Sequence, residues 1–180
     1  MKKHLILQGI AINSLIAALY VVLSLISGPL AFVGGSLQLR ISEILNLLVF
    51  FNPSYTIGVT IGCLLTNILS LYGWPDIVIG TFATLLSCLL IILVSKTLKN
   101  LFFASFIPVI INASLVPVLI YLYDTSVAIM TFYWMSFMWV ALGEIIVVVL
   151  FGYPLILILA KKYKGFYKLI NATQNESFKF

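Results

Sequence analysis

Of the 180 residues, 63% are hydrophobic and only 8% are charged. Soluble domains carry roughly 25% charged residues, so this composition excludes a chain with a water-exposed surface. The length allows one compact unit rather than two domains. The net charge of +5 would suggest a nucleic-acid ligand in a soluble protein, but the positions of the lysines point to another cause. We therefore predict an all-α membrane protein.

Turn residues divide the apolar sequence into six predicted spans, judged against a hydrocarbon core about 30 Å thick. The first apolar run is too long for the roughly 7–15-residue core of a cleavable signal peptide, so it is kept as a span. The second segment is short, and Pro154 in the last predicts a bend because proline cannot donate a backbone hydrogen bond. The predicted spans are Leu5–Ser27, Leu37–Phe51, Ser54–Leu71, Asp76–Val94, Leu101–Tyr123 and Met130–Leu159.

The basic residues fall on one side of this predicted bundle. With six spans, all nine lysines lie at the two termini or between spans four and five, whereas the opposite side carries Asp76 and Asp124. The positive-inside rule then places both termini in the cytoplasm. We expect residues 1–165 to form a single six-helix membrane domain in the cell membrane, and residues 166–180 to form a frayed cytoplasmic tail.

Three charged residues, Arg40, Glu43 and Glu144, lie inside predicted spans. Each costs about 2.5–3.5 kcal/mol at mid-membrane on insertion scales, so each needs a partner or a ligand. Arg40 and Glu43 are three residues apart and could neutralise each other on a helix. Glu144 has no cation on its own span, which leaves either a pair with Arg40 across the bundle or a contact with a ligand.

Polar and aromatic residues gather at the depth of these charges, in the predicted outer half of the bundle. At 1.5 Å per residue, Asn112 and Asn67 lie roughly 20 Å from the cytoplasmic side, where they could contact a ligand or hydrogen-bond between helices. This layout predicts a pocket open to the exterior rather than a continuous channel. The remaining candidates for ligand contact are Trp74, Asp76, Tyr133, Phe137 and Trp134; the aromatic residues among them could instead belong to an interfacial belt.

Several chemistries have no support in the sequence. There is no phosphate-binding glycine loop, nucleophile elbow or His/Glu zinc motif, so we predict neither an enzyme nor a resident cofactor. Cys63 and Cys88 lie in apolar runs and are interpreted as free thiols. A small passive bundle of this kind needs an energy source on another chain. In the first span, Ala11, Ser14 and Ala18 share one face, which indicates close helix packing, either with a partner or within the bundle.

Six segments of the sequence are informative when taken together: Gln38–Glu43, Asn52-Pro53, Gly62–Asn67, Gly73–Thr81, Val109–Ala113 and Ala141–Glu144. Through these segments the chain resembles the substrate-binding S components of energy-coupling factor (ECF) transporters, and most closely the QueT family. The resemblance implies a six-helix fold with cytoplasmic termini, a scaffold subunit and two ATPases as partners, and uptake of a queuosine precursor, a 7-deazaguanine base. S components present an Ala-x-x-x-Ala motif to the scaffold, and here Ser14-x-x-x-Ala18 takes its place.

The chemistry of such a base suggests roles for the buried polar residues. A carboxylate accepts two charge-assisted hydrogen bonds at once from the ring N–H and amine of a guanine-like edge, and Glu144 suits that role. Asn112 or Arg40 could donate a hydrogen bond to the carbonyl of the base. Aromatic side chains could stack on its flat ring. A cationic aminomethyl group would favour Asp76 or Glu43. The alternatives are an S component for another vitamin-like or nucleobase substrate, and a membrane scaffold protein whose buried charges are structural.

Overall fold

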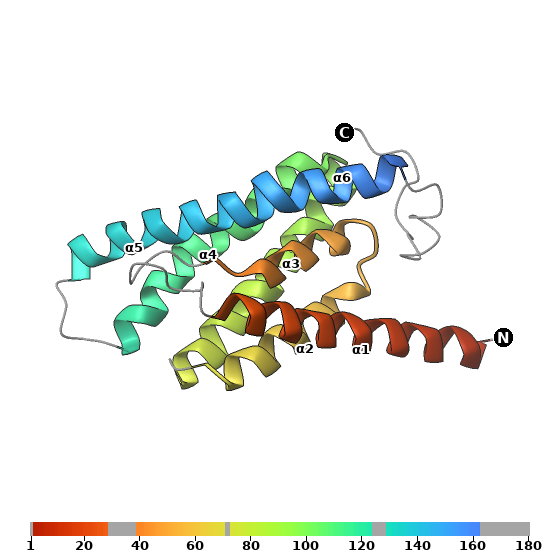
Figure 1. Cartoon of the computed structure of the whole chain (residues 1–180), viewed down its shortest axis with the longest axis horizontal. Coiled ribbons are helices and arrows are strands. Elements are labelled where there is room, and N and C mark those ends of the chain that lie inside the picture. The colour runs from red at the N-terminus through yellow and green to blue at the C-terminus, as the bar shows by residue number, and fades with distance from the viewer. Residues whose placement is uncertain (1, 29–38, 71–72, 124–128, 163–180) are drawn as a thin grey trace.

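The computed structural model describes residues 2–28, 39–70, 73–123 and 129–162, and the elements formed by these residues are all helices (Figure 1). The all-α prediction is therefore confirmed. Element η3 runs directly into α3, and α5, η4 and α6 follow one another without a break. In chain order the elements are α1 (Lys2–Ser27), η2 (Ile41–Phe50), α2 (Tyr55–Ile68), η3 (Asp76–Gly80), α3 (Thr81–Thr97), α4 (Leu101–Tyr123), α5 (Ile129–Glu144), η4 (Ile145–Gly152) and α6 (Tyr153–Lys162).

Four helical segments of the described chain are long and apolar enough to cross a membrane. Each matches a predicted span to within a few residues. The other two predicted spans are also helical but shorter, so the count of six crossings stays a prediction. The tail predicted for residues 166–180 lies outside the described residues. The four long segments are Ile6–Ser27, Asp76–Thr97, Leu101–Leu122 and Tyr133–Lys162, and the two short ones are Ile41–Phe50 and Tyr55–Ile68.

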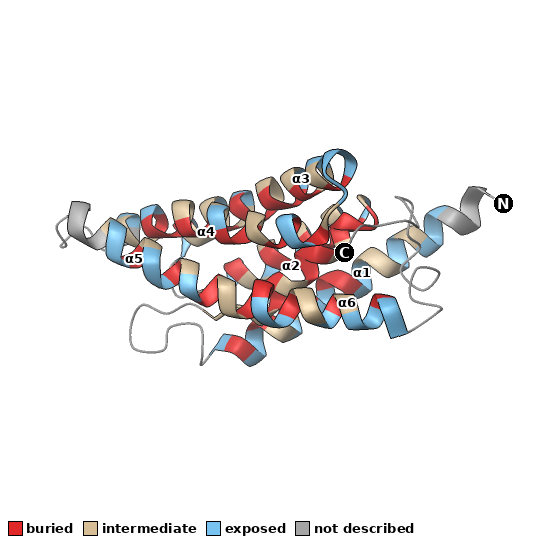
Figure 2. Ribbon diagram, turned by 90° about the horizontal axis from the view of Figure 1, so that it is seen from above, coloured by how far each residue is buried: buried red, intermediate tan, exposed pale blue. Residues whose placement is uncertain are grey.

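The helices form an elongated bundle in which α1 and the continuous rod of α5, η4 and α6 lie on opposite sides of the central elements (Figure 1). Helix α1 begins and α6 ends at the same end of this bundle. Helix α1 packs mainly on α2, and α4 packs mainly on α5. Buried residues face inward along every helix, and exposed ones cover the outside (Figure 2). The outward surface is strongly apolar, as expected for a protein surrounded by lipid.

Element η2 is a ten-residue 3-10 helix in the middle of the bundle. Such helices rise about 2.0 Å per residue and rarely exceed four residues, so this one is unusual. Its residues Leu47, Val49 and Phe50 are fully buried, and so are the polar side chains of Ser42, Glu43 and Asn46. The short second predicted span is therefore an interior element, on which neighbouring helices pack from several directions.

The rod formed by α5 and α6 changes its hydrogen bonding between Glu144 and Pro154. Residues Ile145–Gly152 are π-helical, and the Tyr153 N–H bonds to the Val148 carbonyl five residues earlier. Pro154 has no N–H to offer the Leu150 carbonyl, which disturbs the α-helical pattern just before it. Where a bend is predicted at Pro154, the structure has a π-helical segment just before the proline, and the rod continues beyond it to Lys162.

Helices α1 and α2 approach closely through two glycines spaced as Gly-x-x-x-Gly. A Cβ atom added at Gly58 would lie 2.6 Å from the Asn13 carbonyl oxygen, and one at Gly62 would lie 2.6 Å from Tyr20 Cβ. The Gly58 N–H also donates to the Asn13 side-chain oxygen at 2.9 Å. Small residues at this spacing let membrane helices meet backbone to backbone. The small residues predicted to pack closely, Ala11, Ser14 and Ala18, lie on α1 and do not include this glycine pair.

Candidate functional site

Glu43 lies at the centre of the bundle with none of its surface exposed. The Tyr20 hydroxyl donates to Oε1 at 2.7 Å, and the Asn46 amide donates to Oε2. Both carboxylate oxygens are thus satisfied by neutral donors from α1 and from η2 itself. A buried acid with this set of hydrogen bonds has a complete structural environment and needs no ligand.

The ion pair considered between Arg40 and Glu43 is not present in the described part of the chain. Arg40 precedes η2 with an extended backbone, φ −97° and ψ 95°, so the three-residue spacing does not place the two side chains on one helical face. The Arg40 Nη2 instead donates to the Asn67 side-chain oxygen at 3.0 Å and lies 3.9 Å from Cys63 Sγ.

Asn67 joins Arg40 to the start of η3. Its Nδ2 donates to the Asp76 carbonyl oxygen at 3.0 Å and to the Thr81 hydroxyl at 3.3 Å. A Cβ atom on Gly80 would lie 2.8 Å from Asn67 Nδ2 and 2.5 Å from Asp76 Oδ1, so only glycine leaves room for this contact. The structure therefore brings together Arg40, Asn67 and Asp76. Their hydrogen bonds connect the start of η2 to α2 and η3.

Glu144 and Asn112 form a second buried polar group, between α5 and α4. The Asn112 Nδ2 donates to Glu144 Oε1 at 2.7 Å, and the two side chains are only 5% and 2% exposed. Glu144 makes no ion pair with Arg40 within the described residues. The interhelical partner of Glu144 is thus the Asn112 amide, and not the Arg40 guanidinium considered from the sequence.

The second oxygen of Glu144 has no hydrogen-bond partner among the described residues. Leaving a buried acceptor unpaired costs about 1–3 kcal/mol, and more for a charged group. Glu43 contains no such atom, because both of its oxygens are paired. Of the two buried carboxylates, Glu144 is therefore the one with an unused acceptor, which can receive a hydrogen bond from a ligand.

Aromatic residues lie along α5 between the start of the helix and Glu144. Tyr133 donates its hydroxyl to the Ser114 carbonyl at 3.1 Å, which ties α5 to α4. Phe137 contacts Tyr133 and Trp134, with ring centroids 6.5 and 5.9 Å apart, and packs on the buried cluster of Val116 and Val140. Phe137 is thus the aromatic ring of this group most closely associated with the buried α4–α5 seam.

The two candidate tryptophans lie on the surface. Trp74 is 65% exposed and Trp134 is 58% exposed, so neither shares the buried environment of Glu144. Aromatic rings exposed near the ends of membrane helices are typical of the interfacial belt. Their exposure favours that interpretation over direct contact with a ligand at Glu144.

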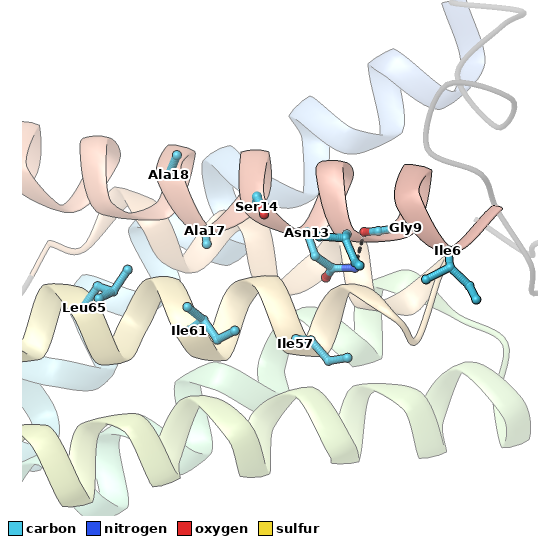
Figure 3. Close-up of a pocket in the computed structure, with 10 residues that line it drawn as sticks. Ile6, Gly9, Asn13, Ser14, Ala17, Ala18, Ile57, Ile61 and Leu65 are labelled. Atoms are coloured by element: carbon cyan, nitrogen blue, oxygen red, sulfur yellow. Dashed lines mark hydrogen bonds between the residues drawn. The ribbon is translucent and has the colours of Figure 1, made fainter. Parts of the chain in front are cut away.

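The small residues of α1 also face outward. Ala11, Ser14 and Ala18 are exposed, whereas the adjacent Ala17 is buried against α2. Ser14 and Ala18 line an apolar groove of about 580 Å³ between α1 and α2 (Figure 3). Packing within the described bundle therefore uses a neighbouring face of α1 and leaves these residues open. The α2 side of the groove is lined by Ile57, Ile61 and Leu65.

Some residues of the two polar groups could not be identified from the sequence. Tyr20 is 23 residues from Glu43, and only the folded chain brings them together. Asn46 carried a local signal, because it follows Glu43 by three residues in the same helix. Cys63, interpreted as a packed thiol, is buried and shares a 3.1 Å hydrogen bond with Thr84 next to Arg40 and Asn67.

Comparison with known proteins covers most of the chain. The family model described as QueT transporter matches residues 10–161. Queuosine precursor transporter QueT of Lactococcus lactis subsp. cremoris is 41% identical over 90 residues, which are 50% of this chain and 53% of that protein. The matched region thus spans about half the length of this curated relative. No solved structure matches the chain. On the family match over residues 10–161, this chain belongs to the QueT transporter family, a family of transporters and not of enzymes.

Proposed function

We propose that the protein is the substrate-capturing S component of an ECF importer and binds a queuosine precursor, a 7-deazaguanine base. The observation that carries this proposal is the unpaired Oε2 of Glu144, held next to Asn112 inside a chain of the QueT family. The curated relative is named a queuosine precursor transporter, which supports the same substrate class.

The chemistry of the base fits an acceptor in this position. The guanine-like edge carries a ring N–H and an exocyclic amine side by side, and a carboxylate accepts hydrogen bonds from both. Within the buried seam of α4 and α5 these bonds are stronger than in water, because the surrounding medium has a low dielectric constant. Phe137 lies two turns from Glu144 on the same helix and supplies an aromatic surface for the ring. Arg40, Glu43 and Asn67 are assigned structural roles in this proposal.

The proposed partners are a transmembrane scaffold subunit and two ATPases. The exposed face of Ala11, Ser14 and Ala18, together with the adjoining groove, supplies a surface where a scaffold helix can approach closely. The chain contains no nucleotide-binding motif, so the energy for uptake has to come from such partners.

The proposed orientation follows from charge. Helix α1 begins and α6 ends at the same end of the bundle, and Lys161 and Lys162 lie there (Figure 1). Lysines concentrate on the cytoplasmic side of membrane proteins, so we assign both termini to the cytoplasm and the protein to the cell membrane as a multi-pass subunit.

The test is a calorimetric titration of the purified protein with 7-deazaguanine bases, together with mass spectrometry of whatever co-purifies with it. Saturable binding of these bases, with adenine-type bases rejected, is expected. Saturable binding of a different vitamin-like or nucleobase ligand would replace the substrate while keeping the S-component role. A protein that binds none of these compounds would be better described as a membrane scaffold protein with structural buried charges.

A further inference from the structure

The contact between Asn112 and Glu144 sets three polar atoms in a fixed order. Asn112 Nδ2 is a donor, Glu144 Oε1 accepts from it at 2.7 Å, and Glu144 Oε2 is a second acceptor with no partner among the described residues. We infer that Asn112 is a specificity-determining residue: it reads the ring carbonyl of the base, and together with Glu144 it presents a donor–acceptor–acceptor edge. This inference rests on the proposed function.

The orientation of the Asn112 amide follows from the chemistry of its partner. The carboxylate oxygen that faces the amide is an acceptor, so the NH₂ group, not the amide oxygen, has to point toward it. An amide nitrogen carries two hydrogens, and the contact with Oε1 uses one of them. The second is not committed to another acceptor in the described part of the chain, and it remains to bind a ligand oxygen next to the carboxylate.

A guanine-type edge is the complement of this order. It offers a carbonyl acceptor, a ring N–H donor and an amine donor in sequence, which would face Asn112 Nδ2, Glu144 Oε1 and Glu144 Oε2 in turn. Cytosine presents the same donor–acceptor–acceptor order when it pairs with guanine. An adenine-type edge has an amine in place of the carbonyl and a bare ring nitrogen in place of the N–H. Its amine donor would face the Asn112 donor, and its ring nitrogen acceptor would face the Glu144 acceptor Oε1.

The surroundings increase the energetic cost of a mismatch. Asn112 and Glu144 are both nearly inaccessible, and the residues next to them along the seam, Ala113 and Val140, are fully buried and apolar. A site built to hydrogen-bond a given group rejects an analogue that lacks it, because the buried polar atoms of the site are then left unpaired. The pair can therefore discriminate at two separate ring positions.

Calorimetric titration with three ligands tests the contributions of Asn112 and Glu144 separately. They are 7-deazaguanine, its 6-thio analogue, which keeps both donors but replaces the carbonyl by a weak acceptor, and 7-deazahypoxanthine, which lacks the amine. For the unmodified protein we expect each analogue to bind about tenfold more weakly, equivalent to one hydrogen bond. In Asn112→Leu the 6-thio analogue and the parent base should bind within about twofold of each other, while the loss caused by the missing amine persists.

A matched control is Asn46→Leu, which removes a buried amide from a buried carboxylate in the other polar group. It should leave both affinity ratios unchanged. If Asn112 only orients Glu144, then Asn112→Leu weakens all three ligands by one common factor and the ratios stay as in the unmodified protein, which overturns the inference.

The unmodified protein supplies a test that does not depend on any variant folding. If it binds 7-deazaguanine but shows no preference for the carbonyl over the thiocarbonyl, the inference fails and the proposed function stands. If it binds no 7-deazaguanine at all, the proposed function fails first. If Asn112→Leu does not fold, Asn112→Ala with the same three ligands replaces it.

Discussion

Replacing Glu144 by glutamine exchanges one carboxylate oxygen for an NH₂ group, and the contact with Asn112 determines which one. Because Asn112 donates to Oε1, the remaining oxygen of the glutamine has to stay at that position to keep the 2.7 Å hydrogen bond. The new NH₂ group then falls where Oε2 is unpaired. A donor would then face the donors of the base at the position where the proposed site needs an acceptor.

The expected effect follows from two contributions. A hydrogen bond to a charged group is worth about 1.5–3 kcal/mol, and a buried donor left without an acceptor adds to that loss. Together they amount to about 2–4 kcal/mol, which lowers the affinity for a 7-deazaguanine by roughly 30-fold to 1000-fold. Calorimetric titration of the purified Glu144→Gln variant measures this loss, and its melting temperature is recorded on the same sample.

Glu43→Gln is the matched control, because Glu43 is an equally buried acid whose two oxygens are both occupied. It should lower the melting temperature through the loss of one hydrogen bond, worth about 1–3 kcal/mol, and leave affinity unchanged. Unchanged affinity of Glu144→Gln together with a lowered melting temperature that Arg40→Gln restores would refute the reasoning. That outcome would show that Glu144 neutralises Arg40, and the site would have to be sought near Arg40 and Trp74.

Three further predictions concern the rest of the molecule. Ser14→Trp or Ala18→Trp should abolish pull-down of the scaffold subunit while ligand binding persists, because bulk on this exposed face prevents close helix approach; normal assembly of both variants would contradict this. Gly62→Ala should lower the free energy of unfolding by about 1–3 kcal/mol in a thermal or denaturant melt, since its Cβ atom would meet Tyr20 at 2.6 Å, whereas Gly9→Ala, which points into open space, should not. The purified chain in liposomes with internal ATP and no partners should show no concentrative uptake of 7-deazaguanine, and accumulation there would disprove the S-component assignment.

Much of the helical pattern could be predicted because it depends on local features. Turn residues and apolar runs locate the ends of the long helices, and Pro154 indicates where the last rod changes its hydrogen bonding. The 3-10 geometry of η2 could not be predicted, because it arises from packing on all sides and not from the preferences of its own residues. The spacing of Arg40 and Glu43 did not predict a contact between them, because the helix begins only after Arg40.

The polar contacts were also predicted only in part from the sequence. Asn112 was predicted at the depth of the charged residues inside the spans, and the structure joins it directly to Glu144. Depth alone could not indicate that Tyr20 reaches Glu43, because that contact depends on the angle at which α1 crosses η2. Pairwise contacts of this kind are properties of the assembled bundle, whereas depth is a property of the sequence.

The π-helical segment limits which insertions and deletions of residues this part of the chain can accept. In a regular α-helix, with about 100° per residue, Ile156 and Ala160 would point about 120° and 160° away from Glu144. All three are nevertheless buried, on a single rod. The wider turns between Ile145 and Gly152 compensate for that rotation. A deletion of one residue that restored regular turns would rotate one half of the rod against the other, so that either the carboxylate leaves Asn112 or the apolar face of α6 turns to the lipid. Insertions and deletions in these eight residues should therefore be tolerated far less than substitutions among Val, Ile and Leu.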